Sequence, residues 1–218
     1  MNKRAAIAIV LLILLTTFIS QKKITFSNFK LKKIEIENNF LLNEKNIKKS
    51  LAKIYNRNLI FLNNKDIEST LTQNSLIESF IFKKKYPDTL KIKIFEKKPI
   101  AILVNKKNKF YLSDKIDLID FNVIQINKDL PYVFGNKDDF KLLYSNLIKI
   151  KFPVNIVKKY TLYDSGRWDI KTVNDKIIKL PLQNYKQNLK NYMNIMGTEN
   201  FKKYFLFDYR IKNQLILK

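Results

Sequence analysis

Three places in the sequence combine residue types that could form a binding contact. Arg167 precedes Trp168, which allows a cation–π or binding pair, or a core tryptophan with a structural arginine beside it. Asp208 and Arg210 are two residues apart and would share one face of a strand, where an ion pair would act as a structural brace. Glu96 lies near lysines at the end of a predicted strand, where a salt-bridge patch and a binding role both remain open. These patterns predict contacts, and none of them predicts a reaction.

The residue types on which most enzymes rely are absent. The 218 residues include no His and no Cys, which excludes a Ser-His-Asp triad, a Cys-His pair, an imidazole zinc site, thiolate metal ligands and a disulfide framework. No Walker A sequence, no GxGxxG sequence, no metal-ligand spacing and no glycosidase-like carboxylate pair occurs either. Carboxylate or lysine chemistry remains open, but the sequence favours a protein that is not an enzyme and that uses no cofactor and no metal.

The composition predicts a folded and strongly basic protein. Hydrophobic residues make up 46% of the chain and aromatic residues 13%, which is enough to form a core despite a net charge of +23. Only four of the 42 basic residues are arginines, the type preferred for phosphate and base contacts, and the charge is spread evenly. We therefore interpret it as a solvated surface that is attracted to anionic membranes, with a membrane-tethered nucleic-acid-binding protein as the alternative.

An uncharged apolar segment follows a short basic amino terminus. It runs from Ala5 to Ser20 and is flanked by basic residues on both sides. Its sixteen helical residues would rise about 24 Å against a hydrocarbon core of about 30 Å, so the flanking basic side chains would have to reach the interface. We predict a cytoplasmic tail over residues 1–4, a transmembrane helix over residues 5–21 and a periplasmic location for the rest.

Two other interpretations of this segment remain. It could be a cleaved signal peptide, although Phe18-Ile19-Ser20 places a large residue where the cleavage site requires a small one. It could also be a buried helix of a soluble domain, although its apolar residues are continuous rather than periodic. An uncleaved anchor accounts best for the pattern.

Residues 29–98 have the pattern of a small α+β domain. Apolar runs and alternation with charged residues predict three strands, at residues 31–37, 76–82 and 90–96. Asn43 and Asn64 are predicted to cap two helices whose apolar residues recur at helical spacing. Two helices on one face of a three-stranded sheet would bury eight apolar residues: Ile34, Ile36, Ile47, Leu51, Leu71, Leu90, Ile92 and Ile94.

Residues 99–218 predict a mostly antiparallel β domain with flanking helices. The helices are expected at residues 138–150 and 182–196, where apolar residues are spaced for one face. Paired strands are expected at 160–162 and 168–172, followed by a hairpin turn at Asn174-Asp175 and a last strand over residues 211–218.

Several motifs resemble those of the FtsQ/DivIB family of bacterial cell-division proteins. The most specific is KKKYPDTLKIKIFEKKPIA, from Lys83 to Ala101. It combines five family residues at fixed offsets: Pro87, Leu90, Glu96, Pro99 and Ala101. LPYVFG, SGRWDIKTVNDKIIKLP and LFDYR also resemble family motifs, in the family's order. The sequence departs from the family at Asn38, Ser75-Leu76, Phe80, Gly166 and Asp175.

The resemblance implies an α+β protein with a single amino-terminal transmembrane helix, a POTRA domain at 29–98 and an FtsQ-type β domain at 99–218. It implies a non-enzymatic divisome scaffold of the bacterial inner membrane, located at the division site, without cofactors or a small-molecule substrate. The implied partners are the paired division proteins FtsB and FtsL, with FtsK, FtsW and FtsI as further candidates.

The last predicted strand is where the resemblance places the FtsB contact. A β-prone segment with nothing after it leaves a sheet edge open, and a partner strand can add to such an edge. The residues that correspond by position to the family's contact are Arg210, Ile211, Asn213, Leu215 and Leu217.

Overall fold

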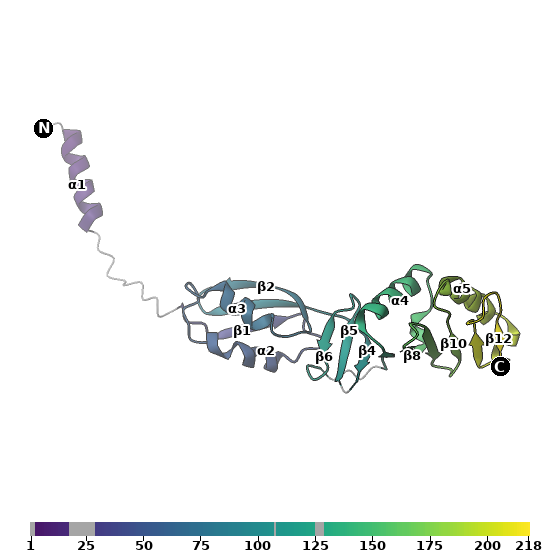
Figure 1. The fold of residues 1–218 in the computed structure, drawn as a ribbon. Helices are drawn as coiled ribbons and strands as arrows, with labels where there is room; N and C mark the ends of the chain where they lie inside the picture. Colours follow the sequence, from purple (N-terminus) through teal and green to yellow (C-terminus); the bar gives the residue numbers. More distant parts are fainter. Residues whose placement is uncertain (1–2, 18–28, 107, 125–128) are drawn as a thin grey trace.

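The computed structural model describes residues 3–17, 29–106, 108–124 and 129–218 (Figure 1). The first helix, α1, spans Lys3–Thr17, 15 residues whose large apolar side chains are exposed. Among the described residues, no helix has both the length and the apolar character needed to cross a membrane. The predicted transmembrane helix, residues 5–21, overlaps α1 from Ala5 to Thr17, and its remaining residues, Ser20 among them, lie outside the described residues.

The amino-terminal unit, residues 29–98, contains the expected three-stranded sheet and two helices. Its elements are β1 (Lys33–Glu37), α2 (Glu44–Ser50), the short 3₁₀ helix η2 (Leu51–Ile54), α3 (Asn64–Leu71), β2 (Ile77–Lys85) and β3 (Thr89–Glu96). The strand order is β1-β3-β2, with β1 parallel and β2 antiparallel to the central β3. The predicted α+β architecture of this unit is confirmed.

Asparagine side chains define where the helices of this unit begin. The Asn43 side chain accepts a hydrogen bond from the Lys45 N–H, as predicted for a cap of α2. The second cap is Asn63 rather than the predicted Asn64, because Asn63 has the extended backbone that lets its side chain accept from the Lys65 N–H. Either of two adjacent asparagines satisfies the sequence pattern, and the backbone conformation selects the first.

The core of the amino-terminal unit agrees closely with the prediction. Seven of the eight residues expected in the core are buried: Ile34, Ile47, Leu51, Leu71, Leu90, Ile92 and Ile94. Ile36 is only partly buried, because it lies near the end of the edge strand β1, but it still packs against the same core. Helix and strand residues therefore share one cluster, as alternation and helical spacing require.

Glu96 has a role that the sequence left open. Its carboxylate accepts three backbone hydrogen bonds, from the N–H groups of Phe40 (3.1 Å), Leu41 (2.8 Å) and Leu42 (2.8 Å). The side chain at the end of β3 therefore closes the loop that leads from β1 to α2. This loop begins at Asn38, which has a left-handed backbone (φ 64°), a conformation that asparagine tolerates better than most residues.

Glu96→Gln is expected to lower the free energy of unfolding by about 2 kcal/mol, because charge-assisted bonds to three N–H donors are replaced by those of a neutral amide. The matched control is Glu37→Gln, which removes an exposed ion pair with Lys91 and should cost no more than about 1 kcal/mol. Urea unfolding of both variants checks this difference, and equal losses would contradict the assigned role of Glu96.

The carboxy-terminal unit, residues 99–218, is built on a nine-stranded sheet. Its strands are β4 (Pro99–Asn105), β5 (Asn108–Ser113), β6 (Leu118–Asp120), β7 (Tyr132–Phe134), β8 (Val157–Leu162), β9 (Trp168–Thr172), β10 (Ile177–Lys179), β11 (Leu206–Asp208) and β12 (Ile216–Leu217). They lie in the order β12-β11-β10-β9-β8-β7-β4-β5-β6. Most neighbours are antiparallel, and the pairs β4–β7, β7–β8 and β10–β11 are parallel.

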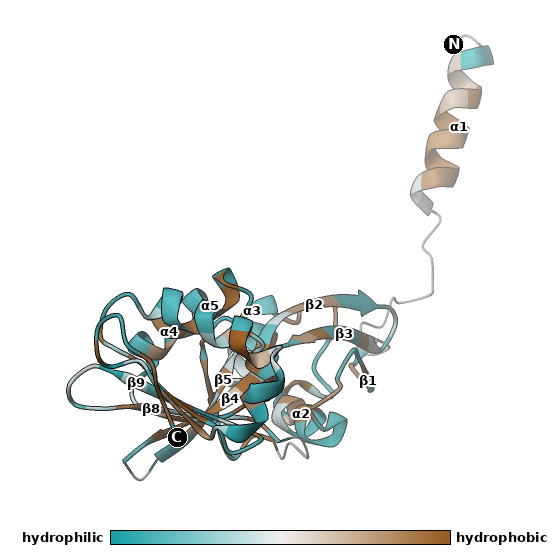
Figure 2. Ribbon diagram, turned by 90° about the vertical axis from the view of Figure 1, so that its right-hand side faces the viewer, coloured by the Kyte–Doolittle hydropathy of each residue, from teal (hydrophilic) through white to brown (hydrophobic). Residues whose placement is uncertain are grey.

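Two helices cover one face of this sheet. They are α4 (Lys137–Lys149) and α5 (Tyr185–Met196), and both lie on the same side of the strands in Figure 2. Two short 3₁₀ helices, η3 (Val154–Ile156) and η4 (Glu199–Lys203), precede β8 and β11. The apolar side chains of α4 and α5 are buried with those of β8 to β11 in a single core. The predicted mostly antiparallel sheet with flanking helices is confirmed.

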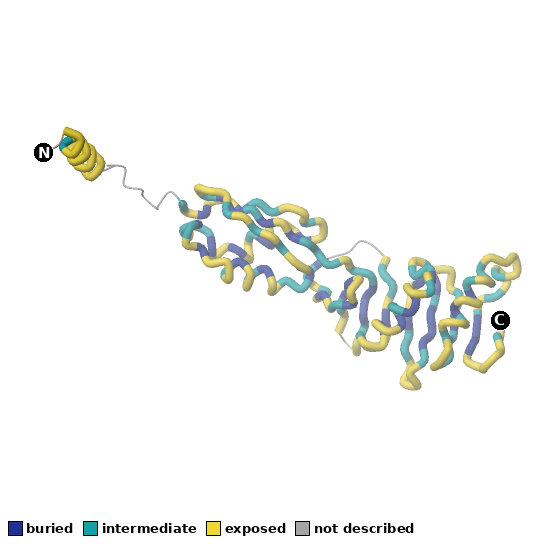
Figure 3. The backbone as a smooth tube through the Cα atoms, turned by 90° about the horizontal axis from the view of Figure 1, so that it is seen from above, coloured by how far each residue is buried: buried dark blue, intermediate teal, exposed yellow. Residues whose placement is uncertain are grey.

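The two units share a continuous apolar junction. Four residues of the carboxy-terminal unit belong to the core cluster of the amino-terminal unit: Ile102, Tyr111, Ile119 and Ile124. The Asp120 N–H donates to the Ser75 hydroxyl oxygen (3.0 Å), and Lys115 forms an ion pair with Glu78. Figure 3 shows buried backbone segments in both units of one elongated body. The chain therefore places its first residues of β1 and its last strand, β12, near opposite ends of this body (Figure 1).

Candidate partner-binding edge

β12 is the outermost strand of the nine-stranded sheet. It is antiparallel to β11, with Phe207 opposite Leu217 and Asp208 opposite Ile216. The predicted strand over residues 211–218 is wrong in length, because β12 contains two residues only. Asn213 has a left-handed backbone (φ 60°) and the Gln214 N–H donates to the Ile211 carbonyl oxygen, so a turn replaces the extended chain there.

The hydrogen-bond register shows which backbone groups of β12 face outward. Lys218 and Leu206 exchange both of their backbone hydrogen bonds across the β11–β12 pair. Because inward and outward groups alternate along an antiparallel strand, the N–H and C=O of Leu217 point away from β11. Within the described part of the chain, no bond to the Leu217 N–H is present. The row of outward-facing backbone groups on β12 is therefore short and is centred on Leu217.

The other predicted contact residues lie outside the strand. Leu215, like Leu217, is partly buried and packs against the core of the carboxy-terminal unit. Ile211 is half exposed, and Ile211 and Asn213 both line a groove beside the edge. The structure thus brings the predicted residues to one end of the sheet, but it divides them between an edge, a core face and a groove.

Arg210, the remaining predicted contact residue, forms an ion pair within the chain. Its Nε and Nη2 donate to Oδ1 (2.8 Å) and Oδ2 (2.6 Å) of Asp208, and its backbone N–H donates to the same carboxylate. Asp208 is buried, and the hydrogen bonds from Arg210 hold the pKa of its carboxyl below the usual value. The predicted structural brace is present, although Arg210 lies just beyond β11 rather than on it.

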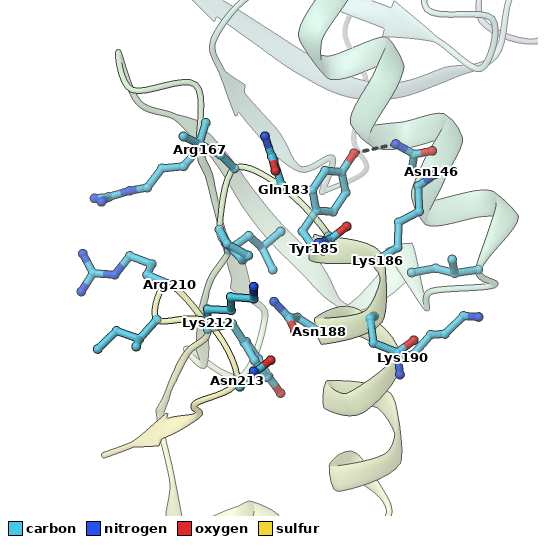
Figure 4. Close-up of a pocket in the computed structure, with 18 of the residues that line it drawn as sticks. Asn146, Arg167, Gln183, Tyr185, Lys186, Asn188, Lys190, Arg210, Lys212 and Asn213 are labelled. Atoms are coloured by element: carbon cyan, nitrogen blue, oxygen red, sulfur yellow. Dashed lines mark hydrogen bonds between the residues drawn. The ribbon is translucent and has the colours of Figure 1, made fainter.

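Arg167 and Trp168 do not form a pair with each other. Trp168 is buried beside Phe140 in the core, whereas the Arg167 guanidinium lies 4.6 Å from the ring centroid of Tyr163. Figure 4 shows Arg167 and Arg210 extending to the same side, away from α5. The sequence analysis missed Tyr163. The hairpin turn was the available signal, since Tyr163 donates its N–H to the Arg167 carbonyl across it.

A row of charged residues crosses the sheet next to this edge. Asp169 on β9 lies opposite Lys179 on β10, which lies opposite Asp208 on β11. Burial raises the pKa of the Asp169 carboxyl, and the charge of Asp169 raises the pKa of the Tyr163 hydroxyl. This row was not predicted, because it depends on the register between strands that are far apart in the chain.

An open groove of about 1240 Å³ adjoins the edge, between α5, the last turns of α4 and the loop after β11 (Figure 4). Its lining includes five basic residues and no Asp or Glu: Arg167, Lys186, Lys190, Arg210 and Lys212. Asn146 donates a hydrogen bond to the Tyr185 hydroxyl and ties α4 to α5 at the groove wall. Arg210 is paired with Asp208, whereas no ion pair involves Lys186, Lys190 or Lys212 among the described residues, so the charge of these three lysines suits a negatively charged ligand segment.

Comparison with known proteins shows similarity to bacterial cell-division proteins. The family model of the FtsQ-type POTRA domain matches residues 29–97. The cell division protein FtsQ of Rickettsia bellii (strain RML369-C) is 28% identical over 203 residues, which cover 87% of this chain and 72% of that protein. The cell division protein FtsQ of Rickettsia conorii (strain ATCC VR-613 / Malish 7) is 26% identical over 217 residues, which cover 94% and 77%.

A solved structure is also similar in part. The major extracytoplasmic domain of the trans isomer of the cell-division protein DivIB from Geobacillus stearothermophilus is 13% identical with a TM-score of 0.35, over 47% of this chain and 93% of that one. The family model covers the amino-terminal unit, and the Rickettsia proteins cover most of the chain. Residues 29–97 thus match the FtsQ-type POTRA domain, and most of the chain is similar to Rickettsia proteins named cell division protein FtsQ.

Proposed function

We propose that this protein is a non-enzymatic scaffold of the divisome, held in the bacterial inner membrane at the division site by a single helix. Its periplasmic part would hold the FtsB–FtsL pair, with FtsK, FtsW and FtsI as further candidate partners. The FtsQ-type POTRA match and the similarity to proteins named cell division protein FtsQ support the division role. The outward-facing backbone of Leu217 at the end of the sheet is the single observation that carries the proposed mode of binding, β-augmentation.

The short edge requires a second source of affinity. Leu217 offers one N–H and one C=O, and each net hydrogen bond is worth about 1 kcal/mol, whereas a micromolar complex requires about 8 kcal/mol. The basic groove and the half-exposed side chain of Ile211 lie next to this edge and can supply the remainder. The partner segment that adds to β12 is therefore expected to continue into acidic residues that enter the groove.

The anchor is proposed to include α1 and to extend through residues 5–21. The large apolar side chains from Ile7 to Leu15 are 50–77% exposed. An exposed apolar helix of this kind is stable in a lipid environment. Tethering restricts the scaffold to the membrane plane, so that several weak contacts can act together at a high effective concentration.

Removing residues 216–218, and with them β12, tests this function. The full-length chain and the truncated chain are each co-expressed with FtsB and FtsL, and the amount of the pair that co-purifies is measured. We expect at least a tenfold loss on truncation, since each 1.4 kcal/mol lost corresponds to about tenfold in affinity. A single cooperative thermal unfolding transition of the truncated chain, with a midpoint above the temperature of the binding assay, is the control for the fold. Unchanged co-purification would place the contact elsewhere.

A further inference from the structure

The chain enters the amino-terminal unit at the turn between β2 and β3. The Leu59 N–H donates to the Phe29 carbonyl oxygen (2.7 Å), and the Lys32 N–H donates to the Asp88 carbonyl oxygen (2.9 Å). The rings of Phe29 and Tyr86 meet edge to face, with centroids 6.0 Å apart. We call this end of the unit the hairpin pole, and define it by Phe29, Lys30, Lys83, Lys85 and Tyr86.

The hairpin pole carries basic side chains without acidic partners. Among the described residues, no carboxylate lies within ion-pair distance of Lys30, Lys83 or Lys85, all of which are exposed. Lys83 lies opposite Lys91 on the face of the sheet that is not covered by the helices. Two lysine side chains are therefore neighbours on this face. The acidic residue of the turn, Asp88, accepts a hydrogen bond from the Thr89 hydroxyl.

The neighbouring β1 does not neutralise this face. Its two glutamates, Glu35 and Glu37, are paired with Lys33 and Lys91. A hydrogen bond from Lys33 is the main reason that the pKa of Glu35 is lowered, and the charge of Lys85 also contributes, so these groups share one electrostatic field. Figure 2 shows the tip of β2 coloured as hydrophilic at the end of the unit where the chain enters. The cations of the pole are therefore in excess.

An aromatic side chain projects among these cations. Tyr86 lies in the turn between Lys85 and Asp88 and is 54% exposed, although tyrosine is usually at least partly covered in a soluble protein. Tyrosine is enriched at the headgroup level of membranes, where its ring contacts lipid and its hydroxyl contacts water. Exposed lysines around a tyrosine are thus the combination that suits an anionic lipid surface.

We propose that the hairpin pole docks on the anionic headgroups of the membrane that holds α1. This inference rests on the proposed anchor. Residues 22–28, which follow the proposed anchor, are seven in number and can span at most about 25 Å, so the pole stays within reach of the headgroups whenever the anchor is inserted. The basic residues of the pole are lysines, and lysine interacts with phosphate as a point charge, without the bidentate geometry that nucleic-acid recognition favours.

Docking at this end orients the whole body. The hairpin pole and β12 lie near opposite ends of the elongated fold (Figure 1). A docked pole would hold β12 and its groove away from the lipid and accessible to a partner. Each lysine near an anionic surface favours the docked state by roughly fivefold, so three lysines shift the docked-to-undocked ratio by on the order of a hundredfold.

Tryptophan fluorescence of the full chain in vesicles tests the docking. Tyr86→Trp keeps an interfacial aromatic residue at the pole, and the single native tryptophan, Trp168, is buried in the carboxy-terminal core. The probe vesicles contain phosphatidylglycerol and phosphatidylcholine at about one to two, with spin-labelled headgroups as the quencher, and the reference vesicles contain phosphatidylcholine only. Co-flotation with the vesicles reports insertion of the anchor separately.

We expect strong quenching of the fluorescence of the introduced tryptophan in the anionic vesicles only, with loss of quenching at high salt. Adding Lys30→Glu, Lys83→Glu and Lys85→Glu should abolish the quenching without reducing flotation. The matched control changes three exposed lysines of the other unit by the same charge, Lys141→Glu, Lys158→Glu and Lys202→Glu, and should leave the quenching unchanged.

Other outcomes separate the two proposals. Flotation without quenching in anionic vesicles would overturn docking and leave the anchor in place. Flotation in anionic vesicles only, lost with the pole variant, would overturn the anchor and support docking. Quenching that is equal in both kinds of vesicle, or that a short DNA duplex removes at low salt while binding to the pole lysines, would overturn lipid docking. The DNA result would assign the pole to nucleic acid.

Discussion

Leu217→Pro is expected to abolish co-purification of the FtsB–FtsL pair, whereas Leu217→Ala is expected to retain most of it. The Leu217 N–H points away from β11, so proline removes a donor that only an added strand would use. The two bonds between Lys218 and Leu206 stay intact in both variants. Both variants also lose the same leucine side chain, which packs against the core, so the alanine variant isolates the backbone effect.

The measurement compares the amount of the pair retained by each variant with its midpoint of thermal unfolding. Both variants should lose about 1–2 kcal/mol of stability, because a partly buried leucine loses its packing contacts. A difference in binding at equal stability would therefore come from the single N–H group. If proline and alanine retain the pair equally, the partner does not extend the sheet at β12, and the groove alone must account for binding.

Arg210→Met is expected to lower the free energy of unfolding by about 2–3 kcal/mol at neutral pH. The substitution leaves the carboxylate of Asp208 buried without its charged partner, and a buried charge that loses its partner is strongly destabilising. The partial exposure of the Arg210 side chain, 39%, places the expected loss below the range for a fully buried pair. Lys171→Met is the matched control, because it breaks an exposed pair with Asp175 and should cost at most about 1 kcal/mol.

The effect of Arg210→Met has a defined pH dependence. Arg210 lowers the pKa of Asp208 in the folded state below the value of about 3.9 that aspartate has in the unfolded chain. A lowered folded-state pKa contributes stability above the unfolded pKa, and this stability is lost as the pH falls through the folded value. The difference in the free energy of unfolding between wild type and variant, measured by urea unfolding, should therefore become smaller below about pH 4. A difference in the free energy of unfolding that stays constant from neutral to acid pH would show that the ion pair is not its cause.

The parts of the fold that local patterns determine were predictable. Strand alternation around Ile92 and helical spacing around Ile47 identified the core of the amino-terminal unit, because each pattern depends only on residues a few positions apart. The one-residue error at Asn64 arose where two adjacent asparagines fit the same cap. The role of Glu96 was not predictable, because its N–H donors lie more than fifty positions away.

In the candidate site, too, local features were predictable and contacts between distant parts of the chain were not. The sequence identified the Asp208–Arg210 pair, since residues two apart near a strand are close in space. It did not identify the row formed by Asp169, Lys179 and Asp208, because β10 and β11 are joined through α5 and their register is set by packing. The length of the last strand was also overestimated, since the β-prone residues around Asn213 do not reveal its left-handed backbone.

The apolar junction between the two units has a mechanical consequence. Residues such as Tyr111 and Ile119 complete a core whose other members come from the first sheet, so bending at this point would expose them to water. We therefore expect the two units to move together as one rigid body rather than as two independent domains. We also expect a force applied at β12 to be transmitted through this shared core to the first unit.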